Sequence, residues 1–260
     1  MARIGRILIT GSSDGLGLLA GKFLAEQGHR VTLHARSDAR AADARRELAS
    51  AERVLVGDVS TLAGMRHVAD QANVAGPYDA VIHNVGTGYR ARRRQQTLDG
   101  LEQIFAVNVL APYVLTALVT RPRRLVYLSS GLHRDGEATL EDPQWTARRW
   151  RDTQPYSNSK LLDVLLAFAV ARRWPDVLSN ALEPGWVPTK MGGPNAPDDL
   201  AQGALTQAWL AVSDDPAANV TGGYFFHQRP RAVHPSAHDT NLQDGLLAYC
   251  ASVSGLAFPS

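Results

Sequence analysis

The sequence has few cysteines, few aromatic residues and little net charge. Cys250 is the one cysteine among 260 residues, and aromatic residues make up 7% of the chain. A single cysteine cannot form a disulfide within the chain, which favours a reducing compartment. The net charge of +2 lacks the strongly basic character of a nucleic-acid-binding protein, so we expect no nucleic-acid partner.

Long apolar runs are also missing. No stretch approaches the roughly 20 apolar residues that span a bilayer. The first residues, MARIGRILITG, enter a strand-like run without the pattern of a signal peptide. We therefore expect a cytoplasmic protein with no membrane partner. The eight histidines show no metal-binding spacing and no G-x-S-x-G motif occurs, so we expect neither a metal site nor a serine hydrolase.

What is present is an alternation of strand-like and helical segments. Hydrophobic residues make up 45% of the chain, enough for one domain over residues 1–260. The alternation predicts an α/β Rossmann-type fold: a doubly wound parallel sheet of about seven strands, with helices on both faces. The expected strands are 6–10, 31–35, 53–57, 78–84, 123–130, 177–184 and 223–227. The main expected helices are 15–27, 61–72, 98–119, 157–173, 198–212 and 239–253.

Two segments interrupt this alternation, at 132–154 and 186–199. Both follow predicted strands, and open α/β sheets bind ligands at the carboxyl ends of their strands. We interpret them as substrate-loop insertions. Their large apolar side chains either line a substrate pocket or only pack the loops: Trp145, Trp150, Trp186 and Met191.

Three glycines follow the first predicted strand, in the stretch ITGSSDGLG. Gly11, Gly15 and Gly17 would let the backbone approach a pyrophosphate at a helix N-terminus. The spacing is G-x-x-x-G-x-G, and a tight turn before a glycine-rich helix is the alternative interpretation. The predicted cofactor loop also includes the residues between these glycines: Ser12, Ser13 and Leu16.

Arg36 stands near the end of the second predicted strand. NAD-selective sites place an acidic residue there for the ribose 2′-hydroxyl. A guanidinium instead matches a phosphate, so we predict that NADP(H) is favoured over NAD(H). A solvated surface arginine is the alternative, and the nearby Asp38 complicates the assignment.

Tyr156 and Lys160 lie four residues apart near the start of a very apolar predicted helix, so they share one face. A phenol has an ordinary pKa near 10, and a nearby cation lowers it. Lys160 and the positive charge of an oxidised nicotinamide could together make Tyr156 a proton donor and acceptor near neutral pH.

Six motifs now define a resemblance that covers nearly the whole chain. TGSSDGLG, HNVG, the asparagine of FAVNVLAPY, YLSS, YSNSK and EPGWVPT occur in the order seen in the short-chain dehydrogenase/reductase family. The TGxxxGxG form resembles its core branch, and the long spacing between Ser130 and Tyr156 resembles its retinol dehydrogenase-like subgroup. The resemblance implies hydride transfer between NADP(H) and a lipophilic carbonyl or alcohol, in a homodimer or homotetramer.

The resemblance also implies roles for four residues. Tyr156 is the expected general acid/base, and Lys160 its activator and a ligand of the nicotinamide ribose. Ser130 would hydrogen-bond the reacting carbonyl oxygen, although Ser129 also ends the strand. Asn108 would hold a water linked to Lys160, or is only structural.

Further cofactor contacts follow from the same resemblance. Asp58 with its neighbour Val59 would contact the adenine, and Asn84 and Gly86 would line the groove. The nicotinamide would be bordered by Pro184, Gly185, Val187 and Thr189. Asp58 and Thr189 have an alternative role as local caps, and we expect His83 to pack rather than to catalyse. A catalytically silent cofactor-binding regulator is the alternative function.

Overall fold

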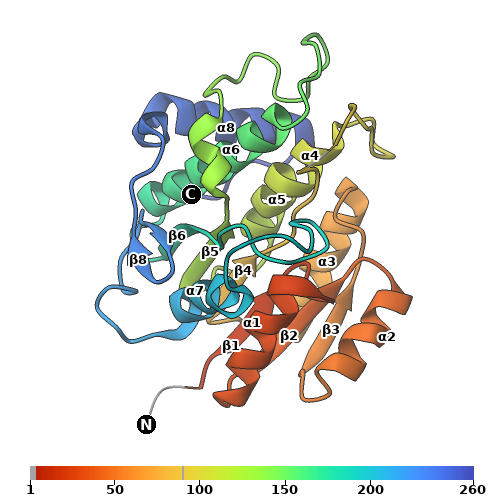
Figure 1. The fold of residues 1–260 in the computed structure, drawn as a ribbon, viewed down its shortest axis with the longest axis vertical. Helices are drawn as coiled ribbons and strands as arrows, with labels where there is room; N and C mark the ends of the chain where they lie inside the picture. Colours follow the sequence, from red (N-terminus) through yellow and green to blue (C-terminus); the bar gives the residue numbers. More distant parts are fainter. Residues whose placement is uncertain (1–3, 90) are drawn as a thin grey trace.

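The computed structural model describes residues 4–89 and 91–260 and has one eight-stranded sheet at its centre (Figure 1). The strand order is β3-β2-β1-β4-β5-β6-β7-β8. Neighbouring strands pair in parallel except β7 and β8, which are antiparallel. The strands are β1 (Arg6–Ile9), β2 (Arg30–Ala35), β3 (Arg53–Val56), β4 (Ala80–His83), β5 (Arg124–Leu128), β6 (Leu178–Glu183), β7 (Tyr224–Phe226) and β8 (Arg229–Pro230).

The sheet order confirms the predicted doubly wound fold. From β1 the chain first adds β2 and β3 on one side, and then returns to place β4 on the other side of β1. Loops at the carboxyl ends of β1 and β4 therefore diverge, and a crevice opens between them. The short β8 is the one strand beyond the seven that the sequence predicts, and it continues the edge after β7.

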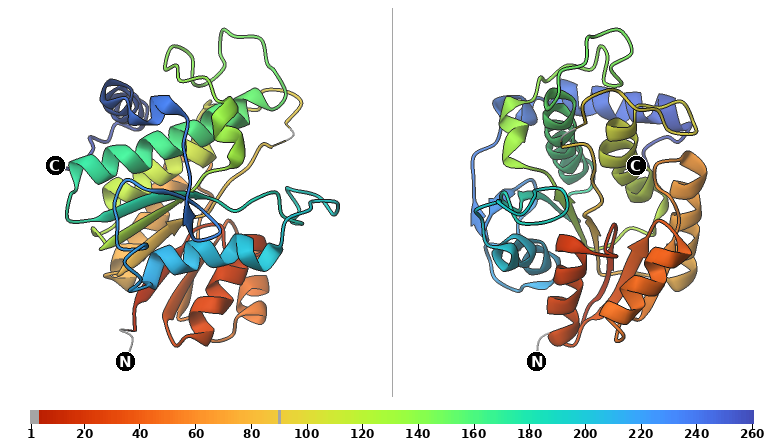
Figure 2. Two further views of the ribbon diagram at one scale, coloured as in Figure 1. Left: turned by 60° about the vertical axis from the view of Figure 1, so that its left-hand side comes forward. Right: turned by 45° about the vertical axis from the view of Figure 1, so that its right-hand side comes forward.

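Helices cover both faces of the sheet (Figure 2). One hydrophobic core contains buried residues of α1, α2 and α7, and the other contains those of α3, α5 and α6. Their bounds are α1 (Gly15–Glu26), α2 (Asp38–Glu47), α3 (Leu62–Ala75), α5 (Ala111–Leu118), α6 (Gln154–Arg173) and α7 (Leu200–Val212). No helix in the described ranges is long and apolar enough to cross a membrane.

The long helix α6 lies between the sheet and a further helix, α8 (Thr240–Ser254) (Figure 2). The residues of α6 are buried without interruption from Pro155 to Ala171. A helix covered on all sides has no solvent-facing stripe, which explains why its sequence is apolar from Leu161 to Ala171 except at Asp163. The same burial encloses the polar residues near its start.

The expected helix over 98–119 is wrong at its start. Gly100 adopts a left-handed φ of 75° in a turn, and helix α4 (Gln103–Phe105) begins only afterwards. The Glu102 carboxylate accepts hydrogen bonds from the Ile104 and Phe105 amides and so fixes this start. A π-helical turn, η1 (Ala106–Leu110), follows before α5. Short 3₁₀ turns, η2 (Gly131–Asp135) and η3 (Pro235–His238), precede α6 and α8.

Candidate active site

A cavity of about 750 Å³ lies at the carboxyl ends of the strands. It runs from the loop after β1 to the segment after β6, and the start of α6 forms part of its wall. Most of the predicted site residues line it: Gly11, Ser13, Gly15, Leu16, Arg36, Asp58, Val59, Asn84, Gly86, Tyr156, Lys160, Pro184 and Thr189. The structure thus brings together segments that are far apart in the sequence.

Four predicted cofactor residues do not line this cavity: Ser12, Gly17, Gly185 and Val187. Ser12 is fully buried. Its hydroxyl donates to the Ile9 carbonyl at 2.7 Å and accepts from the His34 amide at 2.8 Å. Ser12 therefore joins β1 to β2 beneath the loop. Val187 is also buried.

The loop after β1 is shaped by glycine. Gly11 and Gly15 have φ values of 60° and 57°, which side chains rarely adopt. A Cβ atom on Gly17 would lie 2.4 Å from the Asn84 amide nitrogen and 2.9 Å from the Gly11 carbonyl. The His34 ring accepts a hydrogen bond from the Gly11 amide at 3.0 Å. Bare backbone beside a helix N-terminus fits a dinucleotide pyrophosphate.

Arg40, which the sequence analysis missed, also lines the cavity. Its guanidinium donates to the Asp14 carboxylate at 2.5 Å and to the Ser13 hydroxyl at 3.3 Å. Lys190 reaches the same Asp14 oxygen at 2.6 Å. Burial alone would raise the pKa of Asp14, but Lys190 and Arg40 hold it below its usual value. Arg40 lies one helical turn beyond Arg36, and that spacing could have identified it.

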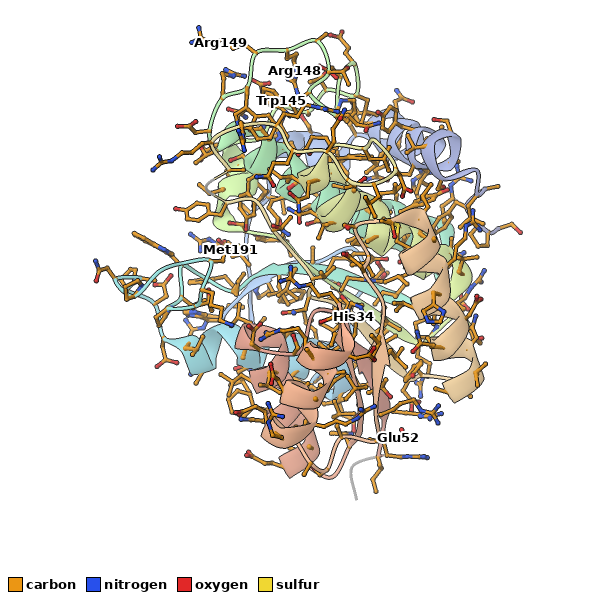
Figure 3. All side chains as sticks on the ribbon, turned by 90° about the vertical axis from the view of Figure 1, so that its right-hand side faces the viewer. His34, Glu52, Trp145, Arg148, Arg149 and Met191 are labelled. Carbon is orange, nitrogen blue, oxygen red and sulfur yellow. The ribbon has the colours of Figure 1, made fainter. Side chains whose placement is uncertain are left out.

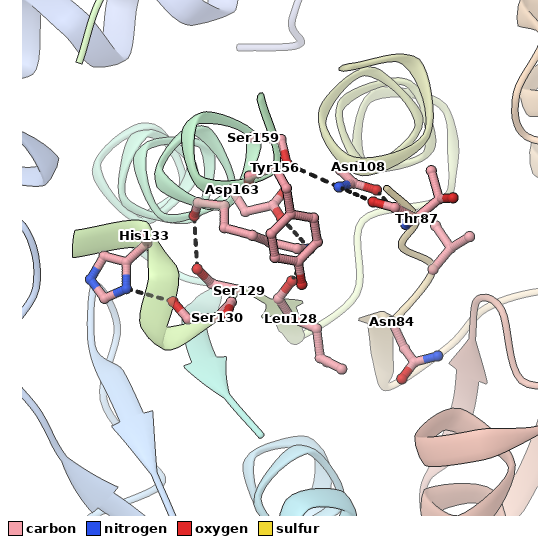
Figure 4. Close-up of polar contacts among 12 residues, drawn as sticks. Asn84, Thr87, Asn108, Leu128, Ser129, Ser130, His133, Tyr156, Ser159 and Asp163 are labelled. Carbon is pink, nitrogen blue, oxygen red and sulfur yellow. Dashed lines mark hydrogen bonds and ion pairs between the residues drawn. The ribbon is translucent and has the colours of Figure 1, made fainter. Parts of the chain in front are cut away.

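Tyr156 and Ser130 meet where β5 ends (Figure 4), and Lys160 donates to the last residue of that strand, Leu128. The ammonium of Lys160 lies 5.7 Å from the centre of the Tyr156 ring. Burial raises the pKa of Tyr156, while the Lys160 charge and a hydrogen bond with Ser130 oppose the rise. The Tyr89 ring packs edge-on against Tyr156 at 5.5 Å. The phenol thus is largely buried, with a cation and a hydroxyl beside it.

The two serines after β5 occupy different places. The Ser129 hydroxyl is buried and donates to the Lys160 carbonyl at 2.7 Å. The Ser130 hydroxyl instead hydrogen-bonds Tyr156 and accepts from the Leu132 amide at 3.3 Å. The Ser130 carbonyl accepts a hydrogen bond from Tyr224 at 3.2 Å. Ser130 is therefore the serine whose hydroxyl is positioned beside the phenol.

Asn108 lies in the π-helical turn, and all its side-chain contacts are internal (Figure 4). Its amide nitrogen donates to the Thr87 carbonyl at 3.1 Å and to the Ser159 hydroxyl at 2.9 Å. Its oxygen accepts from the Thr87 amide at 2.8 Å. Asn108 thus joins α6 to the segment after β4 from one side of the cavity.

Asp163 is a second residue that the sequence analysis missed. Its carboxylate lies 2.8 Å from the Lys160 ammonium, and the two side chains are 3% and 4% exposed. Lys160 also donates to the Leu128 carbonyl at 2.8 Å. The signal was an acidic residue three positions after Lys160 in an otherwise apolar helix.

Of the capping roles considered for Asp58 and Thr189, only that of Thr189 is present, because Asp58 does not cap helix α3. The Asp58 carboxylate accepts from the Ser60 amide at 2.9 Å, although the cap of α3 is Thr61. The Thr189 hydroxyl accepts from the Gly192 amide at 3.1 Å. Both residues line the cavity as well, so a capping contact and a cofactor contact are compatible.

The expectation that His83 packs is confirmed. His83 is buried and stacks on Tyr127 with ring centres 4.8 Å apart. Its ring hydrogen-bonds Thr116 at 3.1 Å. Burial lowers the pKa of His83 to about 3, so the ring is neutral at pH 7. Within the described residues there is no cluster of three metal-ligating side chains.

The four large side chains of the two loops have different surroundings, and Figure 3 shows that Trp145 and Met191 lie in separate loops. Trp145 and Trp150 pack against each other with ring centres 5.7 Å apart, and Arg148 stacks on Trp145. Trp186 is 46% exposed and donates to the Gly192 carbonyl. Met191 lines the large cavity and an adjoining one of about 480 Å³. The tryptophans therefore pack within the loops, whereas Met191 forms part of a pocket wall.

Comparisons with known proteins agree with this geometry. The family model for short chain dehydrogenase matches residues 6–132. An uncharacterized oxidoreductase of Emericella nidulans, AN7799, is 45% identical over 258 residues, covering 98% of each chain. Short-chain dehydrogenase chry4 of Gibberella zeae is 38% identical and covers 98% of this chain and 99% of that protein. The chain belongs to the short-chain dehydrogenase family, and is therefore an NAD(P)-dependent oxidoreductase.

More distant similarities bear on the subgroup and the fold. Human retinol dehydrogenase 13 is 29% identical, over 98% of this chain and 86% of that protein. The retinol dehydrogenase-like subgroup is thus less similar than the fungal relatives. A crystal structure of an uncharacterized protein from Mycobacterium Paratuberculosis superposes with a TM-score of 0.84 at 26% identity, covering 98% and 95%. A metagenomic blue fluorescent protein in complex with NADPH gives 0.71 at 23%, covering 87% and 97%.

Proposed function

We propose that this chain is an NADP(H)-dependent reductase that converts a ketone or aldehyde to an alcohol, or catalyses the reverse reaction. The single observation that carries the proposal is the placement of Tyr156 and Lys160 at one end of a glycine-lined cavity, with the Ser130 hydroxyl hydrogen-bonded to Tyr156 although Ser130 itself does not line the cavity. A phenol supported by an ammonium and a hydroxyl is the arrangement that general acid catalysis at a carbonyl oxygen needs.

The residues of this chain divide the work. A bound reduced nicotinamide supplies a hydride to the carbonyl carbon. Tyr156 donates its phenolic proton to the carbonyl oxygen, and Ser130 donates a hydrogen bond to the same oxygen. Lys160 stabilises the phenolate that remains. Asn108 supports α6 through Ser159.

The cofactor would lie along the cavity. Its pyrophosphate would contact the glycine loop. The 2′-phosphate of NADP(H) would be faced by Arg36, from the turn before α2, and by Arg40, from the first turn of α2. Two guanidiniums favour a phosphate over a diol. The similar fold that was solved with NADPH supports this preference.

The substrate would be a small, lipophilic carbonyl compound. The adjoining cavity is lined by the apolar side chains of Tyr89, Ile104 and Met191 and also by polar and charged ones, among them Arg93, Glu102 and Lys190, and Tyr89 packs on Tyr156. Apolar walls with a few polar groups are typical of small-molecule sites. We further propose that the chain acts as one domain over 1–260, in the cytoplasm, as a homodimer or homotetramer.

The test is NADPH consumption with a panel of aliphatic, aromatic and polycyclic aldehydes and ketones. Tyr156→Phe removes the proton donor, so we expect turnover to fall at least about 100-fold while NADPH fluorescence titrations stay within a few-fold of wild type. Wild-type turnover that survives in Tyr156→Phe would contradict the proposed acid. Tight NADPH binding with no turnover on any compound would favour a cofactor-binding regulator.

A further inference from the structure

The Lys160–Asp163 pair is the most deeply buried ion pair among the described residues. Both groups come from α6, three positions apart, and the ammonium-to-carboxylate distance is 2.8 Å. Charges rarely remain in such an environment unless they are paired. Each of these two charges therefore depends on the other, and a buried aspartate that binds Lys160 calls for a role in the site.

The hydrogen bonds of Lys160 leave it little freedom. An ammonium has three N–H donors. One is directed to the Leu128 carbonyl and one to the Asp163 carboxylate, both at 2.8 Å. A single donor is left for the cavity, which Lys160 lines. Asp163 and Leu128 thus fix where the cationic group lies relative to the phenol.

Asp163 also changes the charge that Tyr156 experiences. Its second oxygen is buried and has no hydrogen-bond partner, so the carboxylate is compensated mainly by Lys160. Burial raises the pKa of Asp163 to about 6 and Lys160 opposes the rise, which leaves the pair ionised at pH 7. The negative charge of Asp163 in turn raises the pKa of Tyr156.

The other titratable groups around the pair leave this charge balance intact. Tyr127 of β5 faces Asp163, and burial keeps its pKa far above neutrality. His83 of β4 stacks on Tyr127 and is neutral. Tyr89 packs on Tyr156 from the loop side. Asp163 is therefore the anion that acts on the Tyr156–Lys160 unit.

We propose that Asp163 is a positioning residue that holds the ammonium of Lys160 and partly neutralises its charge, so that Tyr156 keeps its proton, and can donate it, up to a more alkaline pH. The proposal rests on the reductase function given above. A lysine without this partner would favour the phenolate and would limit carbonyl reduction to lower pH.

Asp163→Asn tests the charge with little change of shape, and Asp163→Glu keeps the charge as the matched control. The alkaline limb of kcat/KM for carbonyl reduction should move down by about one pH unit or more in Asp163→Asn, and should stay near the wild-type value in Asp163→Glu. Because Tyr156 and Lys160 titrate together, the profile reports the pair. Lower activity with an unchanged limb would overturn the proposal.

A second measurement needs neither substrate nor a variant at 163. The ultraviolet difference titration of wild type against Tyr156→Phe reports the phenolate of Tyr156 directly. We expect no phenolate at pH 7 to 8 in the cofactor-free protein. Phenolate already present at pH 7 would overturn the role of Asp163, even if Asp163→Asn does not fold. Absence of wild-type turnover would instead count against the proposed function alone.

Discussion

Two aspartates bind lysines near the cavity at almost the same distance, but in opposite surroundings. Asp163 and Lys160 are 2.8 Å apart and 3–4% exposed, whereas Asp14 and Lys190 are 2.6 Å apart and 43% and 80% exposed. Exposed pairs contribute about 0–1 kcal/mol, while breaking a buried pair costs about 3–5 kcal/mol. Distance alone therefore does not reveal which pair matters for stability.

The difference in exposure also suits the two ion pairs to different roles. The buried pair has no solvent to replace a lost partner, so it suits a fixed geometry at the reacting end of the cavity. The exposed cluster can exchange partners cheaply, because water already competes for its charges. Arg40 can therefore leave Asp14 for a cofactor phosphate at small cost.

The largest effect is expected for Lys160→Met. It removes the cation beside Tyr156 and leaves Asp163 buried without a partner, so turnover should fall at least about 100-fold and the unfolding free energy by about 3 kcal/mol. Urea denaturation and NADPH consumption measure the two effects.

The double variant Lys160→Met/Asp163→Leu is the control for this stability effect. It removes both charges, and should regain most of the lost unfolding free energy but none of the activity. If the single and double variants were equally stable, breaking the buried pair would cost no more unfolding free energy than breaking the exposed pair.

A smaller effect is expected on the exposed side. Arg40→Ala should weaken NADPH binding about 10- to 100-fold, change NADH binding little, and leave the urea midpoint almost unchanged. Fluorescence titration with both cofactors measures this. Arg45→Ala removes another arginine of α2 and should alter neither affinity. An equal loss of NADPH and NADH affinity in Arg40→Ala would place the residue away from the 2′-phosphate.

Acid should lower the unfolding free energy through two buried histidines, by an amount similar to or smaller than the effects above. Burial lowers the pKa of His83 to about 3 and that of His133 to about 4. Both pKa values lie below the unfolded value of 6.5, so these neutral rings stabilise the fold at neutral pH and this contribution is lost as pH falls below about 6.5. His83 alone should cost about 2 kcal/mol between pH 7 and pH 5.

Thermal or urea unfolding at pH 7, 6 and 5 measures that loss. The unfolding free energy of His83→Phe should decline less steeply with falling pH, because phenylalanine has no imidazole to protonate. A decline that is identical in wild type and His83→Phe would mean that His83 titrates normally in the folded protein.

The sequence was sufficient where the position of a candidate site residue depends on spacing along one element or at a strand end. The glycines after β1, the Tyr156 and Lys160 positions and the sheet order follow from short-range patterns that each strand–helix unit repeats. Asp163 was missed although it lies three positions after Lys160 in the same helix, because the sequence does not show that both side chains are buried together. Arg40 was missed because its partners, Ser13 and Asp14, belong to another strand–helix unit. The start of α4 was missed because the Glu102 carboxylate and a left-handed Gly100 outweigh the apolar periodicity before Gln103.

The position of α8 has a consequence for how the protein is made. Helix α6, which carries Tyr156 and Lys160, is enclosed only when α8 packs on it. During synthesis the catalytic helix leaves the ribosome long before the helix that covers it. The nascent chain can thus pair β1 to β5 and shape the glycine loop early, whereas the face of α6 that packs on α8 is covered last. Chaperone binding to the uncovered α6 face is the expected fate of chains that stop before α8.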